Sequence, residues 1–392
     1  MHRILAKAAA DIIQSSLNEG KVLDHALAKA FEANPKWGKR DRSFIAETVF
    51  EVIRWRRALQ FLVESEEVPA LCAAQWIRMG FELPDWWKYA GATSDEIHTR
   101  EALLAEQPRA IRESIPDWLD ALGAEELGEA WDAELTALNQ RTRVYLRVNT
   151  LKTSPSAAIT WLASEYHITA EAVEGLPNTL ALLPGKTIPK SVRMDGRVEI
   201  QDAGSQMIAP LLKPQAGEFV IDTCAGAGGK TLQLAALMQN EGRIIAMDIH
   251  SRKLQELERR ANRAKASKSI ETQVITPDTI DTYREAADCL LIDSPCSGLG
   301  TLKRQPDLKW RLTADQLQRV RATQAELLAS YTQMLKPGGR LVYATCSVLP
   351  SENRAAVDRL ITEGNFSLVE ECIVSPAATG YDGFYAAALV KA

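Results

Sequence analysis

Two cysteines in this chain stand directly after apolar runs and are well suited to covalent chemistry. Cys296 follows the run 289–293 through a Ser-Pro dipeptide, and Cys346 follows the run 341–345. Both runs predict buried parallel strands, and open α/β sheets bind ligands at the carboxyl ends of their strands. We therefore interpret the two thiols as a paired nucleophile and base. A free cysteine is more often a small buried hydrophobe, which is our interpretation of Cys72, Cys224, Cys289 and Cys372.

A glycine-rich turn provides the second half of the pattern. Residues 218–231 predict a strand, this turn and the start of a helix. The end of the turn, Gly229-Lys230-Thr231, resembles a phosphate-binding P-loop, but that pattern requires glycine where this chain has Cys224. The alternative is a nucleoside cofactor, whose ribose is bound by an acidic residue ending the next strand. Asp248 stands at that position and Asp278 at the expected end of a third strand, which favours S-adenosylmethionine or a dinucleotide over a triphosphate.

Several segments together resemble the Sun/Nop2 family of RNA 5-methylcytosine methyltransferases, also called Fmu-like. They are the glycine loop 222–231, Asp248, the Asp-Ser-Pro-Cys segment 293–300 and the Thr-Cys-Ser segment 345–353. Residues 147–152 and 201–206 are similar to segments preceding that family's catalytic domain, and residues 40–45 and 52–57 are similar to the NusB-like domain of its bacterial ribosomal RNA branch. One departure is Gly226-Ala227, where the family usually has Ala-Pro.

The resemblance implies a role for each of these residues. Cys346 would be the nucleophile that adds to carbon 6 of cytosine, and Cys296 would assist release of the product, as a base or through a water. Asp293 would hydrogen-bond the ring, and Lys230 would orient Asp293 or favour a thiolate. The residues expected to bind S-adenosylmethionine are Cys224, Ala225, Gly226, Ala227, Gly228, Gly229, Lys230, Asp248 (ribose), Asp278 (adenine) and Asp293.

The expected substrate is RNA, and specifically ribosomal RNA of the small subunit (16S), because the helical front resembles that branch. The target base must be unpaired or flipped out, since a thiol cannot reach carbon 6 within a stack. Transfer RNA is the alternative substrate. DNA is disfavoured because the Glu-Asn-Val motif of DNA cytosine enzymes is absent. A non-catalytic RNA-binding assembly factor and, more distantly, a P-loop ATPase are the alternatives from other classes.

Composition is that of an ordinary globular protein, with 46% apolar and 25% charged residues among 392. Irregularly spaced cysteines and no signal peptide predict reduced thiols in the cytoplasm. No apolar run is long enough for a membrane span, and the scattered histidines predict no metal site. We expect a monomer.

The formal net charge of −5 is unevenly distributed, because residues 91–140 carry 12 acids and 3 bases. Basic residues elsewhere are therefore candidates for phosphate contacts, with a solvated surface as the alternative. They are Arg141, Arg143, Arg147, Lys152, the seven bases within 251–269, and Lys303, Arg304, Lys309 and Arg311.

The predicted fold class is α/β, a class I methyltransferase with a doubly wound sheet preceded by two smaller regions. Residues 1–140 predict an all-α, NusB-like RNA-binding domain, and 141–205 a small α/β region like an RNA-recognition fold. Residues 206–392 predict the Rossmann-like methyltransferase domain. Its expected strands lie near 218–223, 243–247, 272–275, 288–292 and 340–345, with a turn at 337–339 and an antiparallel edge pair at 366–371 and 384–390.

Overall fold

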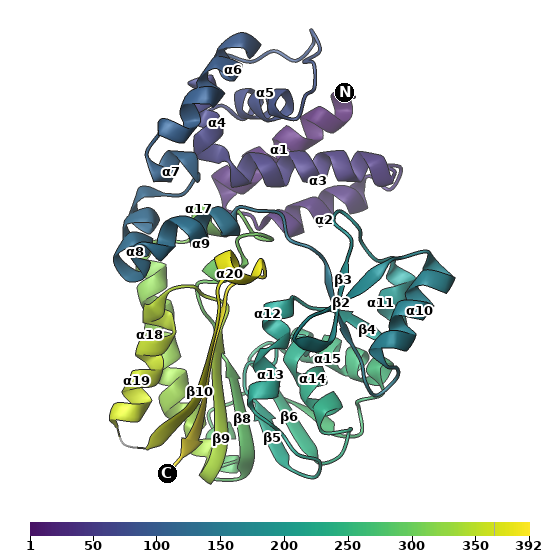
Figure 1. Cartoon of the computed structure of the whole chain (residues 1–392), viewed down its shortest axis with the longest axis vertical. Helices are drawn as coiled ribbons and strands as arrows, with labels where there is room; N and C mark the ends of the chain where they lie inside the picture. Colours follow the sequence, from purple (N-terminus) through teal and green to yellow (C-terminus); the bar gives the residue numbers. More distant parts are fainter. Residues whose placement is uncertain (364) are drawn as a thin grey trace. The chain divides into compact units, whose positions relative to one another are not determined.

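The structure is a computed structural model that describes residues 1–363 and 365–392 (Figure 1). The chain forms two compact units. One consists of Met1–Gln140 with Leu302–Ala314, and the other of Arg141–Thr301 with Asp315–Ala392. Every helix among the described residues is too short or too polar to cross a lipid bilayer.

The first unit is helical, as the spacing of its apolar residues predicts. Ile45, Val49 and Val52 on α3 are fully buried and lie on one face of that helix. The helices of this unit are α1 (Arg3–Glu19), α2 (Leu23–Ala33), α3 (Lys39–Arg54), α4 (Arg56–Val63), α5 (Val68–Arg78), α6 (Ser94–Leu103), the 3₁₀ turn η1 (Leu104–Glu106), α7 (Arg109–Arg112), α8 (Asp117–Leu127), α9 (Ala130–Leu138) and α17 (Leu308–Arg311).

The segment Leu302–Ala314 belongs to the helical unit although the chain on both sides of it belongs to the other unit. Lys309 and Trp310 in this segment cap the end of α3. The Lys309 ammonium donates to the Arg54 carbonyl at 2.9 Å, and the Trp310 indole donates to the Ile53 carbonyl at 2.7 Å. These carbonyls have no partner within the helix, so the segment supplies hydrogen bonds that α3 lacks.

This arrangement corrects one expectation about the basic residues after the Pro-Cys motif. Lys303 is 3% exposed and Lys309 is fully buried, so neither side chain forms a solvated face or is free to contact phosphate. Burial, followed by the nearby charge of Arg54, lowers the pKa of Lys309 well below its ordinary value. The role of Lys309 is therefore structural.

The second unit begins with a small four-stranded antiparallel sheet in the order β2-β3-β1-β4. The elements alternate in the β-α-β-β-α-β pattern of ferredoxin-like domains. They are β1 (Tyr145–Val148), α10 (Pro155–Tyr166), β2 (Ala170–Val173), β3 (Leu176–Leu182), α11 (Lys190–Asp195) and β4 (Val198–Ile200). Two short helices, α12 (Ala203–Gln206) and α13 (Ile208–Leu211), lead into the large sheet.

The large sheet has seven strands in the order β10-β11-β9-β8-β5-β6-β7. The strands β9, β8, β5, β6 and β7 are parallel to one another. Strand β11 runs antiparallel to β9, and β10 runs antiparallel to β11. The strands are β5 (Phe219–Asp222), β6 (Arg243–Asp248), β7 (Ile270–Val274), β8 (Ala287–Asp293), β9 (Leu335–Thr345), β10 (Phe366–Val374) and β11 (Phe384–Lys391). The doubly wound sheet and its antiparallel edge pair are confirmed.

Helices cover both faces of this sheet (Figure 1). Alternate strand residues point to opposite faces. Leu291 therefore lies in the core beneath α14 and α15, and Leu290 lies in the core beneath α18 and α19. The helices are α14 (Gly229–Leu237), α15 (Ser251–Ala264), α16 (Thr279–Thr282), α18 (Ala314–Tyr331), α19 (Arg354–Thr362) and α20 (Pro376–Thr379), with 3₁₀ turns η2 (Leu299–Thr301), η3 (Thr332–Met334) and η4 (Pro350–Glu352).

The prediction of a separate turn at residues 337–339 is wrong. Strand β9 begins at Leu335 and runs through these residues. The pairing with β8 shifts register between Ala287 and Cys289, and Gly338 adopts a φ of 72°. An irregular strand start with a glycine in the left-handed region therefore replaces a separate turn.

Strand β5 ends in Asp222, a carboxylate that is 1% exposed. Its Oδ2 accepts a hydrogen bond of 2.7 Å from the Thr231 hydroxyl on α14, so it ties the strand to the helix after the glycine loop. Its Oδ1 has no hydrogen-bond partner within the described part of the chain. Burial raises the pKa of Asp222 to about 7, and the hydrogen bond from Thr231 only partly opposes this shift.

The raised pKa predicts how the stability of Asp222→Asn depends on pH. Folded protein binds this proton more tightly than unfolded protein, so the ionisation of Asp222 costs stability as pH rises from about 4 to about 7. The variant lacks this ionisation, so the urea midpoint of the variant minus that of the wild type should increase as pH rises through this window. A difference between the two midpoints that does not change with pH would contradict the account. Asp281→Asn, at an exposed carboxylate, is the control.

Candidate active site

The two predicted cysteines lie together at the carboxyl edge of the large sheet. Strands β8 and β9 are parallel neighbours, with Asp293 opposite Ala344. The backbone amide of Ser294 continues the pairing beyond β8 by donating to the Ala344 carbonyl at 2.8 Å. The loops that follow bring the sulfur atoms of Cys296 and Cys346 to 3.3 Å, and both thiols are free and half-buried.

The electrostatics of this thiol pair are asymmetric. The hydrogen bond to Cys346 and burial raise the pKa of Cys296 well above its ordinary value, and the charge of Glu352 adds to the shift. Cys296 therefore keeps its proton and can donate it in a hydrogen bond to the Cys346 sulfur. The Cys346 sulfur therefore has a hydrogen-bond donor in contact with it.

The remaining cysteines are in environments that disfavour the thiolate. Burial raises the pKa of both Cys224 and Cys289 to about 12, and it also raises the pKa values of Cys72 and Cys372. At neutral pH these four thiols stay protonated and act as small apolar side chains.

An ion pair connects the glycine loop to the edge that carries the thiols. Lys230, in the first turn of α14, donates to the Asp293 carboxylate at the end of β8, with a distance of 2.6 Å. The same ammonium lies 5.5 Å from the centre of the Phe384 ring, at the start of β11. Lys230 is 8% exposed, so its charge acts in a partly dehydrated environment where this ion pair is stronger than on an open surface.

The end of β6 is organised around the carboxylate of Asp248. One oxygen accepts the Gly226 amide at 3.0 Å, and the other accepts the His250 amide at 2.8 Å. Gly226 has a φ of 55°, and a Cβ atom added at Gly226 or Gly229 would meet no atom within 4 Å. The glycine loop thus borders open space in which a ligand can approach its backbone.

Asp278 differs from the other predicted residues. It lies in the turn that leads from β7 into α16, and its side chain is exposed. Its backbone carbonyl accepts the Thr282 hydroxyl at 2.8 Å. It lies beyond the end of a strand, as the sequence pattern predicts, but among residues 1–363 and 365–392 no hydrogen bond holds its carboxylate.

Three buried side chains in this region were given no role from the sequence. They are Asp222, Glu352 and Phe384. Asp222 and Glu352 stand within the motif segments 222–231 and 345–353, and this position in the sequence could have indicated that they belong to the site. The proximity of Phe384 to Lys230 depends on the pairing of β11 with β9, which the local sequence does not indicate.

Several basic residues expected on an RNA-binding surface have structural partners instead. Arg147 on β1 is 4% exposed and donates to the Gln201 side chain and the Gly229 carbonyl. Arg260 and Arg263 both pair with Glu199. The bases of the 251–269 segment with exposed side chains are Arg252, Lys253, Arg259, Lys265 and Lys268.

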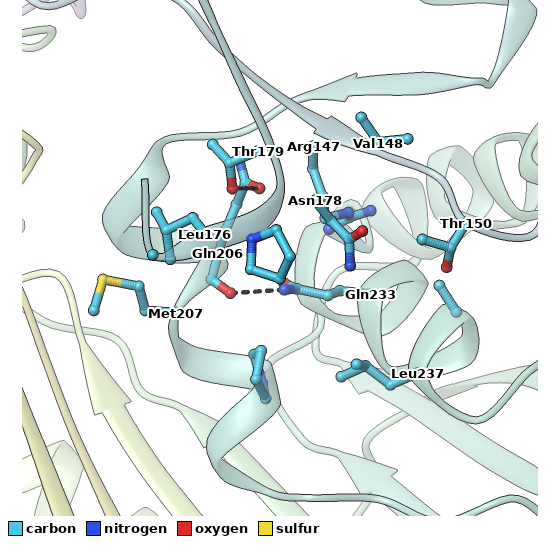
Figure 2. Close-up of a pocket in the computed structure, with 14 residues that line it drawn as sticks. Arg147, Val148, Thr150, Leu176, Asn178, Thr179, Gln206, Met207, Gln233 and Leu237 are labelled. Carbon is cyan, nitrogen blue, oxygen red and sulfur yellow. Dashed lines mark hydrogen bonds between the residues drawn. The ribbon is translucent and has the colours of Figure 1, made fainter. Parts of the chain in front are cut away.

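A separate cavity of about 330 Å³ lies between the small sheet and α14, within the second unit. Figure 2 shows Gln233 of α14 pointing toward Gln206, whose backbone carbonyl accepts its amide at 2.7 Å. Thr179 of β3 donates to the Gln206 side chain at 2.7 Å (Figure 2). The cavity is lined by neither thiol and by none of the predicted cofactor residues, so we do not assign the chemistry to it.

Among residues 1–363 and 365–392, no group of three or more His, Cys, Asp or Glu side chains could hold a metal ion. The thiol edge supplies two sulfur atoms in contact, one of them on a thiol that keeps its proton, and a carboxylate held by an ammonium.

Comparison with known proteins identifies the family. Residues 209–390 match the family described as 16S rRNA methyltransferase RsmB/F, and residues 115–188 match the ferredoxin-like domain of RsmF/B-like methyltransferases. A probable ribosomal RNA small subunit methyltransferase B from Synechocystis is 32% identical, with 92% of this chain and 90% of that protein covered. The corresponding methyltransferase from Vibrio cholerae is 32% identical, with 72% and 66% covered.

Solved structures show the same fold. The structure of PH0851 superposes with a TM-score of 0.80 at 23% identity, covering 98% of this chain and 99% of that one. NSun6 from Pyrococcus horikoshii, determined with SFG, has a TM-score of 0.63 at 21% identity, covering 70% and 98%. These structures show the fold, while the relative that is 32% identical over 92% of this chain shows that the chain belongs to the RsmB/F family of 16S rRNA methyltransferases.

Proposed function

We propose that this protein is an S-adenosylmethionine-dependent methyltransferase that forms 5-methylcytosine in RNA of the small ribosomal subunit. The observation that carries the proposal is the thiol pair: two free sulfur atoms 3.3 Å apart at the carboxyl edge of the sheet. A methyltransferase acting on a nitrogen or a ribose oxygen needs no nucleophilic cysteine. One acting on carbon 5 of cytosine does, because that carbon is a poor nucleophile until a thiolate adds to carbon 6.

In this mechanism the Cys346 thiolate forms a bond to carbon 6, and the ring electrons move to carbon 5, which takes the methyl group and leaves the electrons of the broken bond on the sulfur that carried it. The proton on carbon 5 must then leave so that the ring double bond re-forms and Cys346 departs as a thiolate. Cys296, once its own proton has passed to solvent, accepts this proton directly or through a water. Its raised pKa makes its thiolate a strong base.

Asp293 and Lys230 would stabilise the charge that develops on the ring. Asp293 ends β8, the strand before the Cys296 loop, and would hydrogen-bond the ring nitrogen and the exocyclic amine. The 2.6 Å contact with Lys230 holds the carboxylate in one orientation before the substrate binds. A preorganised group of this kind loses little free energy to reorientation during the reaction.

The residues around the glycine loop fit S-adenosylmethionine, which when bound supplies the methyl group as an electrophile. Asp248 is held by two backbone amides with its carboxylate at the loop, where it would accept the ribose hydroxyls. The backbone from Cys224 to Lys230 would hold the methionine end, because the first-turn amides of α14 have no intrahelical acceptors. Asp278 would contact the adenine amine.

The domains would divide the binding of RNA among them. We propose that the helical domain, residues 1–140, and the ferredoxin-like region, 141–205, hold the RNA, while residues 206–392 carry the chemistry. The exposed basic residues of the 251–269 segment are the best candidates for phosphate contacts, and this segment follows β6, the strand that ends in Asp248. The target cytosine must leave its stack to reach the thiols.

The thiol mechanism predicts a trapped intermediate in the Cys296→Ala variant. Cys346 can still add to carbon 6, but loss of the residue that assists release should leave RNA covalently attached to the protein. Incubation with small-subunit ribosomal RNA and S-adenosylmethionine, followed by denaturing electrophoresis, measures the adduct, and sequencing of the attached RNA locates the cytosine.

The double variant Cys296→Ala/Cys346→Ala is the control and should form no adduct. Cys372→Ala, at a cysteine outside the site, should behave as the wild type. If the adduct persists in the double variant, Cys346 is not the nucleophile. If transfer RNA is attached and ribosomal RNA is not, the substrate assignment is wrong while the chemistry stands.

The assignment of Asp248 predicts weaker cofactor binding by Asp248→Ala. Loss of a charged acceptor for two hydroxyls should raise the dissociation constant of S-adenosylmethionine by about 10- to 100-fold. Isothermal titration calorimetry measures this constant without RNA. Glu271→Ala, at an exposed carboxylate on the next strand, is the matched control and should bind as the wild type. Equal affinity in Asp248→Ala and Glu271→Ala would remove Asp248 from the cofactor site.

A further inference from the structure

Each of the two cysteines is followed by a serine, and the hydroxyl groups of the two serines are in contact. The hydroxyl oxygens of Ser297 and Ser347 are 3.3 Å apart. Both hydroxyls donate to one carboxylate oxygen of Glu352, each at 2.5 Å. The other oxygen of Glu352 accepts the backbone amide of Ser297 at 2.7 Å. One carboxylate thus joins the two loops that carry the sulfur atoms.

This carboxylate is completely buried. Glu352 is 0% exposed, and Ser297 and Ser347 are 4% and 1% exposed. Its further neighbours are also hydrogen-bond donors or acceptors: Gln324 donates to it at 3.4 Å, and Tyr343 donates to its backbone carbonyl at 2.8 Å. Within the described residues, no basic side chain forms an ion pair with Glu352. A buried carboxylate balanced by neutral donors is costly unless its geometry is well maintained.

The loops have few other direct connections. The Ser294 amide donates to the Ala344 carbonyl at 2.8 Å, and the Gly300 amide donates to the Cys346 carbonyl at 2.9 Å. Neither bond involves the side chains of Ser297 or Ser347. The two serine hydroxyls contact each other, and Glu352 accepts a hydrogen bond from each, so one carboxylate acts on both Cys-Ser dipeptides.

We propose that Glu352 is a positioning residue that sets the separation of the two thiols by binding the hydroxyls of Ser297 and Ser347, the residues that follow the two cysteines. The proposal rests on the proposed two-cysteine mechanism for its functional meaning, but the geometry stands independently of it. The charge of Glu352 also helps to keep the proton on Cys296, since it is among the causes that raise the pKa of that thiol.

The sulfur separation can be measured without any substrate by disulfide trapping. The full chain is treated with the thiol oxidant diamide, which takes up two hydrogens as a pair of thiols forms a disulfide. Peptide mass spectrometry then follows the rate at which the Cys296–Cys346 disulfide appears. The wild type should form this disulfide readily, because its sulfur atoms are in contact.

Glu352→Gln keeps the shape of the side chain but replaces one acceptor oxygen with a donor, so it cannot accept both hydroxyls on one oxygen and the Ser297 amide on the other atom. We expect disulfide formation to slow by about tenfold, and methyl transfer at saturating RNA to fall by about 10- to 100-fold with little change in the KM for the cofactor. Glu352→Asp, which keeps the charge on a shorter arm, should recover part of both rates.

Ser297→Ala/Ser347→Ala provides a second route to the same result if Glu352→Gln does not fold, because it removes both hydroxyls and leaves the carboxylate. The matched control is Ser269→Ala, a buried serine before β7 whose hydroxyl donates to Asn240 at 2.8 Å. It should form the disulfide at the wild-type rate.

Wild-type trapping rates in the double serine variant and in folded Glu352→Gln would overturn the proposal, as would the absence of trapping in the wild type. A wild-type protein that forms the disulfide but methylates no cytosine would instead refute the proposed function and leave the positioning role of Glu352 intact.

Discussion

The register between β8 and β9 is the constraint on which the thiol site depends. Parallel strands end at the same edge of a sheet, and pairing of Asp293 with Ala344 places Cys296 and Cys346 in adjacent loops. A slip by one residue would turn every side chain of one strand to the opposite face, and both cores of the sheet prevent this because Leu290 and Leu291 are each fully buried on different faces. Packing far from the sulfur atoms therefore determines that they meet.

The polar groups around this edge form a connected arrangement. Lys230 joins the glycine loop to Asp293, and Glu352 joins the Cys296 loop to the Cys346 loop. Asp222 connects strand β5 to α14, the helix that carries Lys230. Each of these carboxylates is partly or wholly removed from water, so its hydrogen bonds are strong and their loss is costly. The cofactor region and the thiol region are in this way held by the same few side chains.

Much of this site was predictable, and the reasons are local. Strand ends are recognisable where apolar runs stop, so Asp248, Asp293 and both cysteines could be placed from their neighbours in sequence. Burial of Lys309 and Arg147 was not predictable, because their partners are carbonyls and side chains far away along the chain, such as the end of α3 for Lys309. The same holds for the membership of Leu302–Ala314 in the helical unit.

The central claim is that the methyl group goes to carbon 5 of cytosine. The most direct measurement uses unmodified small-subunit ribosomal RNA, the protein, and S-adenosylmethionine with a deuterated methyl group, followed by digestion to nucleosides and mass spectrometry against standards. The account predicts a deuterated 5-methylcytidine in RNA treated with the wild type and none with Cys346→Ala. Label on a cytosine nitrogen, on a ribose or on another base would contradict it.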